Sequence, residues 1–117
     1  MVTGTDKRLE EFRVKFLPKL VDAFHPRLVL AFGSRARREA LTHSDLDLLI
    51  VSDAFRDIRW SDRPVRVIEK LGLSMGVDML CYTEEEYGRK RQELGIVRTA
   101  SEEGVLLFGN PVHYRAV

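Results

Sequence analysis

The sequence has little of what marks secreted or membrane proteins. It contains a single cysteine, Cys81, so no disulfide can form within the chain and a disulfide-stabilised secreted scaffold is excluded. No apolar run approaches the roughly 20 residues that span a bilayer. Residues 1–12 also lack the apolar core of a signal peptide. These absences make the cytoplasm the expected location and predict no membrane partner.

An excess of charge of one sign is lacking too. The formal net charge is +1, whereas non-specific binding to long nucleic acid normally needs a large positive field. We therefore expect no long nucleic acid as a partner, although a local basic patch stays compatible with the sequence. What is present is a globular composition, with 44% hydrophobic and 32% charged residues. A length of 117 residues, without a long linker or an internal repeat, predicts one domain over residues 1–117.

Apolar periodicity predicts alternating helices and short strands. Apolar residues three and four apart indicate an amphipathic helix over 6–24, which Pro18 should kink or break. Strands are predicted over 27–32, 45–51, 76–82 and 105–109, and further helices over 35–41, 64–72, 84–93 and 96–103. Thr83 and Glu86 form a capping-box signature, and 52–60 is expected to be an irregular loop. This order predicts an α/β (α+β) domain, a small mixed sheet flanked by helices.

The sharpest local feature begins where the first predicted strand turns into a helix, at Gly33 and Ser34. A glycine at such a turn lets the backbone approach a phosphate, and the free N–H groups of a helix start favour an anion. The hydroxyl of Ser34 can add a hydrogen bond. The turn therefore predicts a phosphate site, although a Gly-Ser turn by itself is more often a plain loop.

Two aspartates follow at the mouth of the next predicted strand. Asp45 and Asp47 lie two residues apart, so in an extended strand both side chains project from one face, while Leu46 and Leu48 point into the core. Two carboxylates on one face repel each other unless a cation compensates them. Magnesium suits such a pair because it binds carboxylates together with phosphate oxygens and water. Alone, the pair would equally fit the capping of a turn beside Ser44.

Asp78 is a third candidate, placed among apolar neighbours in another predicted strand. A lone aspartate in an apolar strand needs a partner, which an arginine in a structural salt bridge could also supply. If this strand lies beside the one with Asp45 and Asp47, the three carboxylates suffice for two metal ions. The three features in this order favour a catalytic site over a coincidence of caps and turns.

The run from Gly33 to Val51 resembles the signature of the DNA polymerase beta-like nucleotidyltransferases, a glycine-serine turn followed by an aspartate pair, with a later single aspartate. The short chain, the run Ser44–Leu48 and the ending over 96–110 are similar to the minimal nucleotidyltransferase (MNT) antitoxins of bacteria and archaea. This resemblance spans most of the chain. It departs from the family at Arg38, where many members have glycine, which affects the shape of the loop.

The resemblance implies a role for each residue of the motif. Gly33 and Ser34 would hold the triphosphate of the nucleotide. Asp45 and Asp47 would ligate the metal ions, and Asp78 would bind the catalytic metal or help to deprotonate the attacking hydroxyl group. Most of the rate would come from positioning and charge neutralisation, as in other phosphoryl transfers.

A basic cluster follows the Gly-Ser turn. Arg35 comes directly after the serine and could reach the β- or γ-phosphate, because a guanidinium matches the geometry of phosphate. Arg37 and Arg38 are better explained as a solvated helix face. A P-loop is excluded, because no second glycine is followed by lysine and serine or threonine.

The implied reaction is transfer of a nucleoside monophosphate, AMP from ATP, to a hydroxyl acceptor, with two Mg²⁺ ions and release of pyrophosphate. The implied acceptor and partner is a HEPN-type toxin, which MNT antitoxins neutralise by binding, by adenylylating a tyrosine, or by both. The alternative is a silent antitoxin that acts by binding alone. Val65, Ile68 and Leu73, or the tail 112–117, are candidates for the interface.

Overall fold

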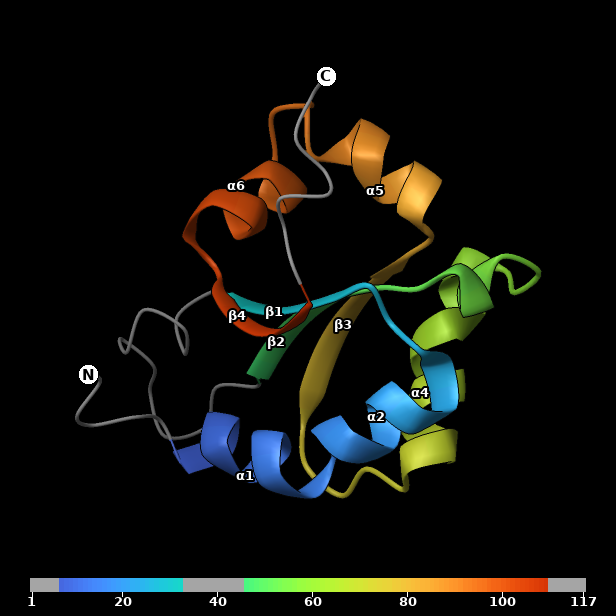
Figure 1. Ribbon diagram of the computed structural model, residues 1–117, viewed down its shortest axis with the longest axis vertical. Helices are drawn as coiled ribbons and strands as arrows, with labels where there is room; N and C mark the ends of the chain where they lie inside the picture. Colours follow the sequence, from blue (N-terminus) through green and yellow to red (C-terminus); the bar gives the residue numbers. More distant parts are fainter. Residues whose placement is uncertain (1–6, 33–45, 110–117) are drawn as a thin grey trace.

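The computed structural model describes residues 7–32 and 46–109, drawn in colour in Figure 1. In these ranges the elements follow the order α1 (Lys7–Lys15), α2 (Leu17–Phe24), β1 (Leu28–Phe32), β2 (Leu46–Val51), η1 (Asp53–Phe55), η2 (Trp60–Asp62), α4 (Arg63–Leu71), β3 (Val77–Tyr82), α5 (Glu84–Lys90), α6 (Ile96–Glu103) and β4 (Val105–Gly109). The helix predicted over 35–41 lies outside the described residues. None of the described helices is long and apolar enough to cross a membrane.

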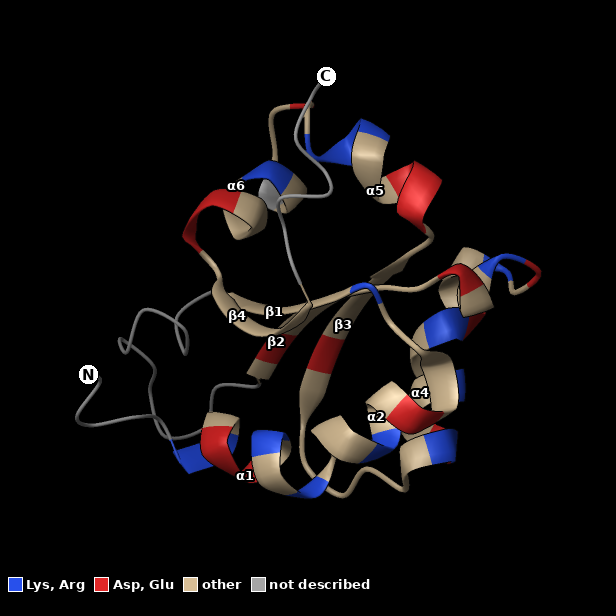
Figure 2. Ribbon diagram, in the orientation of Figure 1, with Lys and Arg blue, Asp and Glu red and all other residues tan. Residues whose placement is uncertain are grey.

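The strands form one four-stranded sheet in the order β3-β2-β1-β4. β1 pairs antiparallel with both β2 and β4, whereas β2 and β3 run parallel, which makes the sheet mixed. Most of the sheet consists of uncharged residues, and acidic bands appear on β2 and β3 (Figure 2). The small mixed sheet predicted from the sequence is thereby confirmed, and so is its α+β class.

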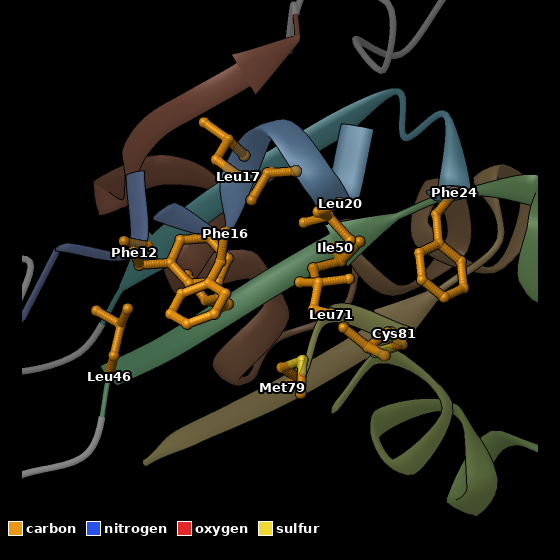
Figure 3. Packing of buried hydrophobic residues seen from close by; sticks show 14 of the residues in the cluster. Phe12, Phe16, Leu17, Leu20, Phe24, Leu46, Ile50, Leu71, Met79 and Cys81 are labelled. Carbon is orange, nitrogen blue, oxygen red and sulfur yellow. The ribbon is translucent and has the colours of Figure 1, made fainter. Parts of the chain in front are cut away.

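Helices cover the sheet on both sides, with α1, α2 and α4 on one face and α5 and α6 on the other (Figure 1). Alternation along the strands divides their buried side chains between two clusters. On the first face, Ile50 and Cys81 pack with residues of the helices such as Phe12, Leu20 and Leu71 (Figure 3). The second cluster lies under α5 and α6 and contains Leu28, Leu30, Leu49, Val51, Tyr82, Tyr87, Val97 and Ala100.

The first predicted helix is broken, as Pro18 indicated. α1 ends at Lys15 and α2 begins at Leu17, with Pro18 in its first turn, where the missing N–H of a proline has no intrahelical partner to lose. α2 ends at Phe24 and is capped by His25, which has a left-handed φ of 46° and whose N–H donates to the carbonyl of Val21 at 3.0 Å.

The capping box predicted for α5 is present. The hydroxyl of Thr83 accepts from the N–H of Glu86 at 3.2 Å, and the carboxylate of Glu86 accepts from the N–H of Thr83 at 2.9 Å. The helix stops at Lys90 rather than near Glu93. The N–H groups of residues 92 and 93 bond three residues back, at 3.2 and 3.1 Å, so the chain tightens into turns.

The connection from β2 to β3 is more ordered than the expected irregular loop. It contains the two short 3₁₀ turns η1 and η2 before α4 begins. Arg63 fixes it: its Nη1 donates to the carbonyl of Cys81 at 3.0 Å and its Nε to that of Ile58 at 2.9 Å. The same guanidinium bonds Glu86 of α5, with 2.6 Å between Nη1 and Oε1. One buried cation therefore joins the loop, β3 and α5.

Candidate active site

Asp47 and Asp78 lie side by side on neighbouring strands. They are paired positions in the parallel ladder of β2 and β3, where strands run about 4.8 Å apart. The acidic bands of the two strands adjoin in Figure 2. The sequence predicted a shared site on the condition that these two strands be neighbours, and the structure meets that condition.

Both carboxylates belong to the face of the sheet that α5 and α6 partly cover. Asp47 alternates with Leu48, which packs against α1 and α2, and shares its face with Leu49, which packs in the second cluster. By the same alternation, Asp78 shares its face with Leu80, which packs against that cluster. Asp47 is partly buried and Asp78 is exposed. The pair therefore lies where an apolar sheet face opens toward solvent.

The pair sits at one end of the sheet. Asp47 is the second residue of β2 and Asp78 the second residue of β3, while β1, running the opposite way, ends there at Phe32. Phe32 is the cross-strand partner of Asp47. It shares the face of Leu30, packs against the second cluster and is only partly buried. One aromatic ring and two carboxylates thus follow one another across three strands.

Gly104 forms the turn between α6 and β4, beside the end of β1. A Cβ built on Gly104 would lie 2.5 Å from the carbonyl oxygen of Ala100 and 3.0 Å from that of Ala31. Both contacts are with backbone, so any side chain would push α6 away from the end of β1. The sequence alone does not reveal this role of Gly104, because close approach between distant segments leaves no local signature.

The remaining predicted site residues, Gly33, Ser34, Arg35 and Asp45, lie outside the described residues. β1 ends at Phe32, just before this segment in the sequence, and β2 begins at Leu46, just after it. Both attachment points are at the end of the sheet that bears Asp47. Within residues 7–32 and 46–109 no group of three or more potential metal ligands is found.

The donor chemistry of the described pair fits a hard cation. Carboxylate oxygens are ligands that Mg²⁺ prefers, and opposite charge between the two strands relieves the repulsion of paired aspartates. The thiol of Cys81 belongs to the other face of the sheet, where burial raises its pKa to about 12. It stays protonated at neutral pH and is neither a soft ligand nor a nucleophile. Cys81 is therefore a small residue of the hydrophobic core.

Trp60 is the first residue of η2 and the one tryptophan of the sequence. The indole packs against Tyr82, with 6.2 Å between ring centroids, and 49% of the residue stays exposed. Trp60 therefore packs at the edge of the domain, at the opposite end of β3 from Asp78.

The sequence shows no sign of the role of Arg63, because nothing local marks one buried arginine in a segment rich in surface arginines.

Comparison with known protein families identifies the family of this chain. The family model of the nucleotidyltransferase domain matches residues 13–107, which include Phe32, Asp47 and Asp78. The chain belongs to the nucleotidyltransferase domain family. A comparison with curated proteins finds no match.

The fold of this nucleotidyltransferase is shared by a crystal structure from Sulfolobus solfataricus that is described as a candidate nucleotidyltransferase. The two chains are 23% identical, with a TM-score of 0.51 over 93% of this chain and 94% of the other. At that identity the likeness supports the fold alone. The family model identifies a nucleotidyltransferase domain, a class that generally uses nucleoside triphosphates and divalent metal ions.

Proposed function

We propose that this nucleotidyltransferase transfers AMP from ATP to a hydroxyl group, with Asp47 and Asp78 at the reacting centre. The observation that supports the proposal is their paired register on one face of the sheet, inside a domain of this family. Asp45, two residues before Asp47, completes the proposed ligand set for two Mg²⁺ ions. Bound there, Mg²⁺ would neutralise charge on the phosphate oxygens.

The proposed reaction forms one bond and breaks one at the α-phosphorus. The acceptor hydroxyl oxygen attacks in line, the bond to the β-phosphate oxygen breaks, and pyrophosphate leaves with the electron pair. The hydroxyl proton passes to the carboxylate of Asp78 or through it to water. Asp78 suits this role because it is exposed on the outermost strand of the described sheet, where an acceptor can reach it.

The triphosphate is assigned to the Gly-Ser turn. Gly33 and Ser34 directly follow Phe32 in the sequence, and the cross-strand partner of Phe32 is Asp47. Arg35 is proposed to neutralise the β- or γ-phosphate, which gains negative charge as the bond to the α-phosphate breaks.

The proposed biological role is that of an MNT-type antitoxin that modifies a HEPN-type toxin in the cytoplasm. It rests on the resemblance of the motif from Gly33 to Val51 and on the exposure of Asp78, which leaves the reacting carboxylate open to a macromolecular hydroxyl. A tyrosine of the partner protein is the acceptor class that this resemblance implies.

A second candidate role is neutralisation by binding alone. It is favoured by apolar side chains on the outer side of α4, where Val65 is 53% and Ile68 39% exposed. These residues face away from the sheet, so a partner could dock there without touching the acidic pair.

One labelling experiment separates the two roles. The protein is incubated with Mg²⁺ and α-labelled ATP, with and without the protein encoded beside it, and label on protein or RNA is followed. Asp47→Asn and Asp78→Asn should abolish labelling. Asp57→Asn is the matched control, because Asp57 is an exposed aspartate in the connection from β2 to β3. Partner binding with no label under any condition would leave the binding role and refute the enzymatic one.

A further inference from the structure

Phe32, Asp47 and Asp78 form a row across three strands, and the proposed reaction gives Phe32 no role. Phe32 pairs with Asp47 across β1 and β2, and Asp47 pairs with Asp78 across β2 and β3. Directly opposed side chains on one face have Cβ atoms about 4.5–5.5 Å apart, which an aromatic ring spans easily. The ring therefore flanks the Asp47 carboxylate on the side away from Asp78.

Burial changes in a graded way along this row. The preceding residues of β1 on the same face, Leu28 and Leu30, are 0% and 3% exposed. Phe32 and Asp47 are partly buried, and Asp78 is exposed. Exposure is therefore greatest on β3 and decreases toward β1.

The outer side of the ring has a fixed neighbour as well. β4 begins at Val105, paired with Ala31, and the α6–β4 turn at Gly104 packs against the carbonyl of Ala31. Phe32 thus follows the residue that this turn approaches, it is paired in register with Asp47, and it packs against the second cluster. In a closely packed protein, a ring that packs against a core leaves fewer rotamers to a side chain beside it.

We propose that Phe32 is a positioning residue, which holds the Asp47 carboxylate toward Asp78 and keeps water from its β1 side. A carboxylate with fewer orientations loses less entropy when it binds a cation, so the ring strengthens metal binding without touching the metal. The inference deepens the proposed function and depends on its assignment of Asp47 and Asp78 as ligands.

The test measures the Mn²⁺ dissociation constant of the purified chain by electron paramagnetic resonance of free Mn²⁺, with no partner and no turnover. Phe32→Leu and Phe32→Met remove the ring but keep an apolar side chain, whereas Phe32→Tyr retains a ring. Phe108→Leu is the matched control, because Phe108 is a partly exposed phenylalanine of β4 that pairs with Val29, on the other face. Thermal unfolding is recorded for every variant.

Phe32→Leu and Phe32→Met are expected to raise the dissociation constant about tenfold, the lower end of what loss of an orienting group costs a metal site. Phe32→Tyr and Phe108→Leu should stay near wild type. Unchanged Mn²⁺ binding in both ringless variants would overturn the proposal, and so would an equal loss in Phe108→Leu, which would indicate general loosening.

Asp78→Asn distinguishes failure of this inference from failure of the proposed function. If Asp78→Asn weakens Mn²⁺ binding and the Phe32 variants do not, the metal site stands and only the positioning role falls. If wild type and Asp78→Asn bind Mn²⁺ equally, the assignment of the ligands is wrong, and the role of Phe32 falls with it.

Discussion

The guanidinium of Arg63 lies 2.6 Å from the carboxylate of Glu86, measured from Nη1 to Oε1, and only 5% of the arginine side chain is exposed. Two carbonyl oxygens, of Ile58 and Cys81, also accept from Arg63. Removal of the buried arginine leaves these acceptors without their donor, a cost that exposed ion pairs do not have.

Arg63→Met is therefore expected to lower the free energy of unfolding by about 2–4 kcal/mol, measured by urea denaturation. Arg98→Met is the control, because Arg98 and Glu102 form an exposed pair on α6 at 3.3 Å and should lose no more than about 0.5 kcal/mol. Equal losses in the two variants would show that Arg63 contributes no more than a surface charge.

The same pair predicts a pH dependence. The hydrogen bond from Arg63 holds the pKa of Glu86 below its usual range, so this carboxylate binds its proton less readily in the folded state. Its contribution to stability is complete above the unfolded pKa of about 4.3 and is lost as pH falls through the lower folded pKa. The difference in unfolding free energy between wild type and Glu86→Gln should shrink from about pH 6 to about pH 3. A constant difference would contradict the shift.

Asp78→Asn should separate stability from activity. Without divalent metal its unfolding temperature should equal or exceed that of wild type, because one of two paired like charges is gone. Mg²⁺ should raise the unfolding temperature of wild type more than that of the variant. Nucleotidyl transfer should fall at least about 100-fold in kcat/KM, since loss of even outer groups of a metal site costs about 10- to 100-fold. A variant that keeps full activity would remove Asp78 from the mechanism.

Gly104→Ala tests the close approach of α6 to β1. The added methyl group would meet the carbonyl oxygens of Ala100 and Ala31 and should cost about 1–3 kcal/mol of stability. Gly88→Ala is the control, because a Cβ there meets nothing within 4 Å in α5, and alanine favours helix. The unfolding temperatures of both variants are compared with that of wild type. An unchanged unfolding temperature in Gly104→Ala would show that the turn between α6 and β4 can move.

Cys81 should resist alkylation in the folded protein. Burial raises the pKa of its thiol to about 12, so almost no thiolate exists at about pH 8. Mass spectrometry after treatment with iodoacetamide should find label on the urea-unfolded chain and little on the native one. Rapid native labelling would indicate that β3 opens at its end near α5.

Local patterns predicted most of the fold. Pro18 marked the break between α1 and α2, Thr83 and Glu86 marked the start of α5, and apolar segments marked every described strand. These signals are local, because capping, proline geometry and alternation each depend on residues a few positions apart.

The candidate site was only partly predictable, for a physical reason. Asp47 and Asp78 stood out as acids in apolar strands, but their shared register became visible only once β2 and β3 were paired. Phe32 resembled any apolar residue at the end of a strand, and Arg63 any arginine at the start of a helix. Their roles depend on neighbours that are distant in sequence, and pairwise contacts of that kind leave no periodic pattern.

The parallel pairing of β2 and β3 requires the chain to cross the sheet between them, and it crosses on the side of α4. Val67 and Leu71 of α4 pack in the first cluster, on the face opposite Asp47 and Asp78. The outer surface of this crossover is thus separated from the carboxylates by the thickness of the sheet. Evolution or an engineer could rebuild the outer surface of this crossover, or attach a reporter to it, and leave the chemistry on the other side of the sheet intact.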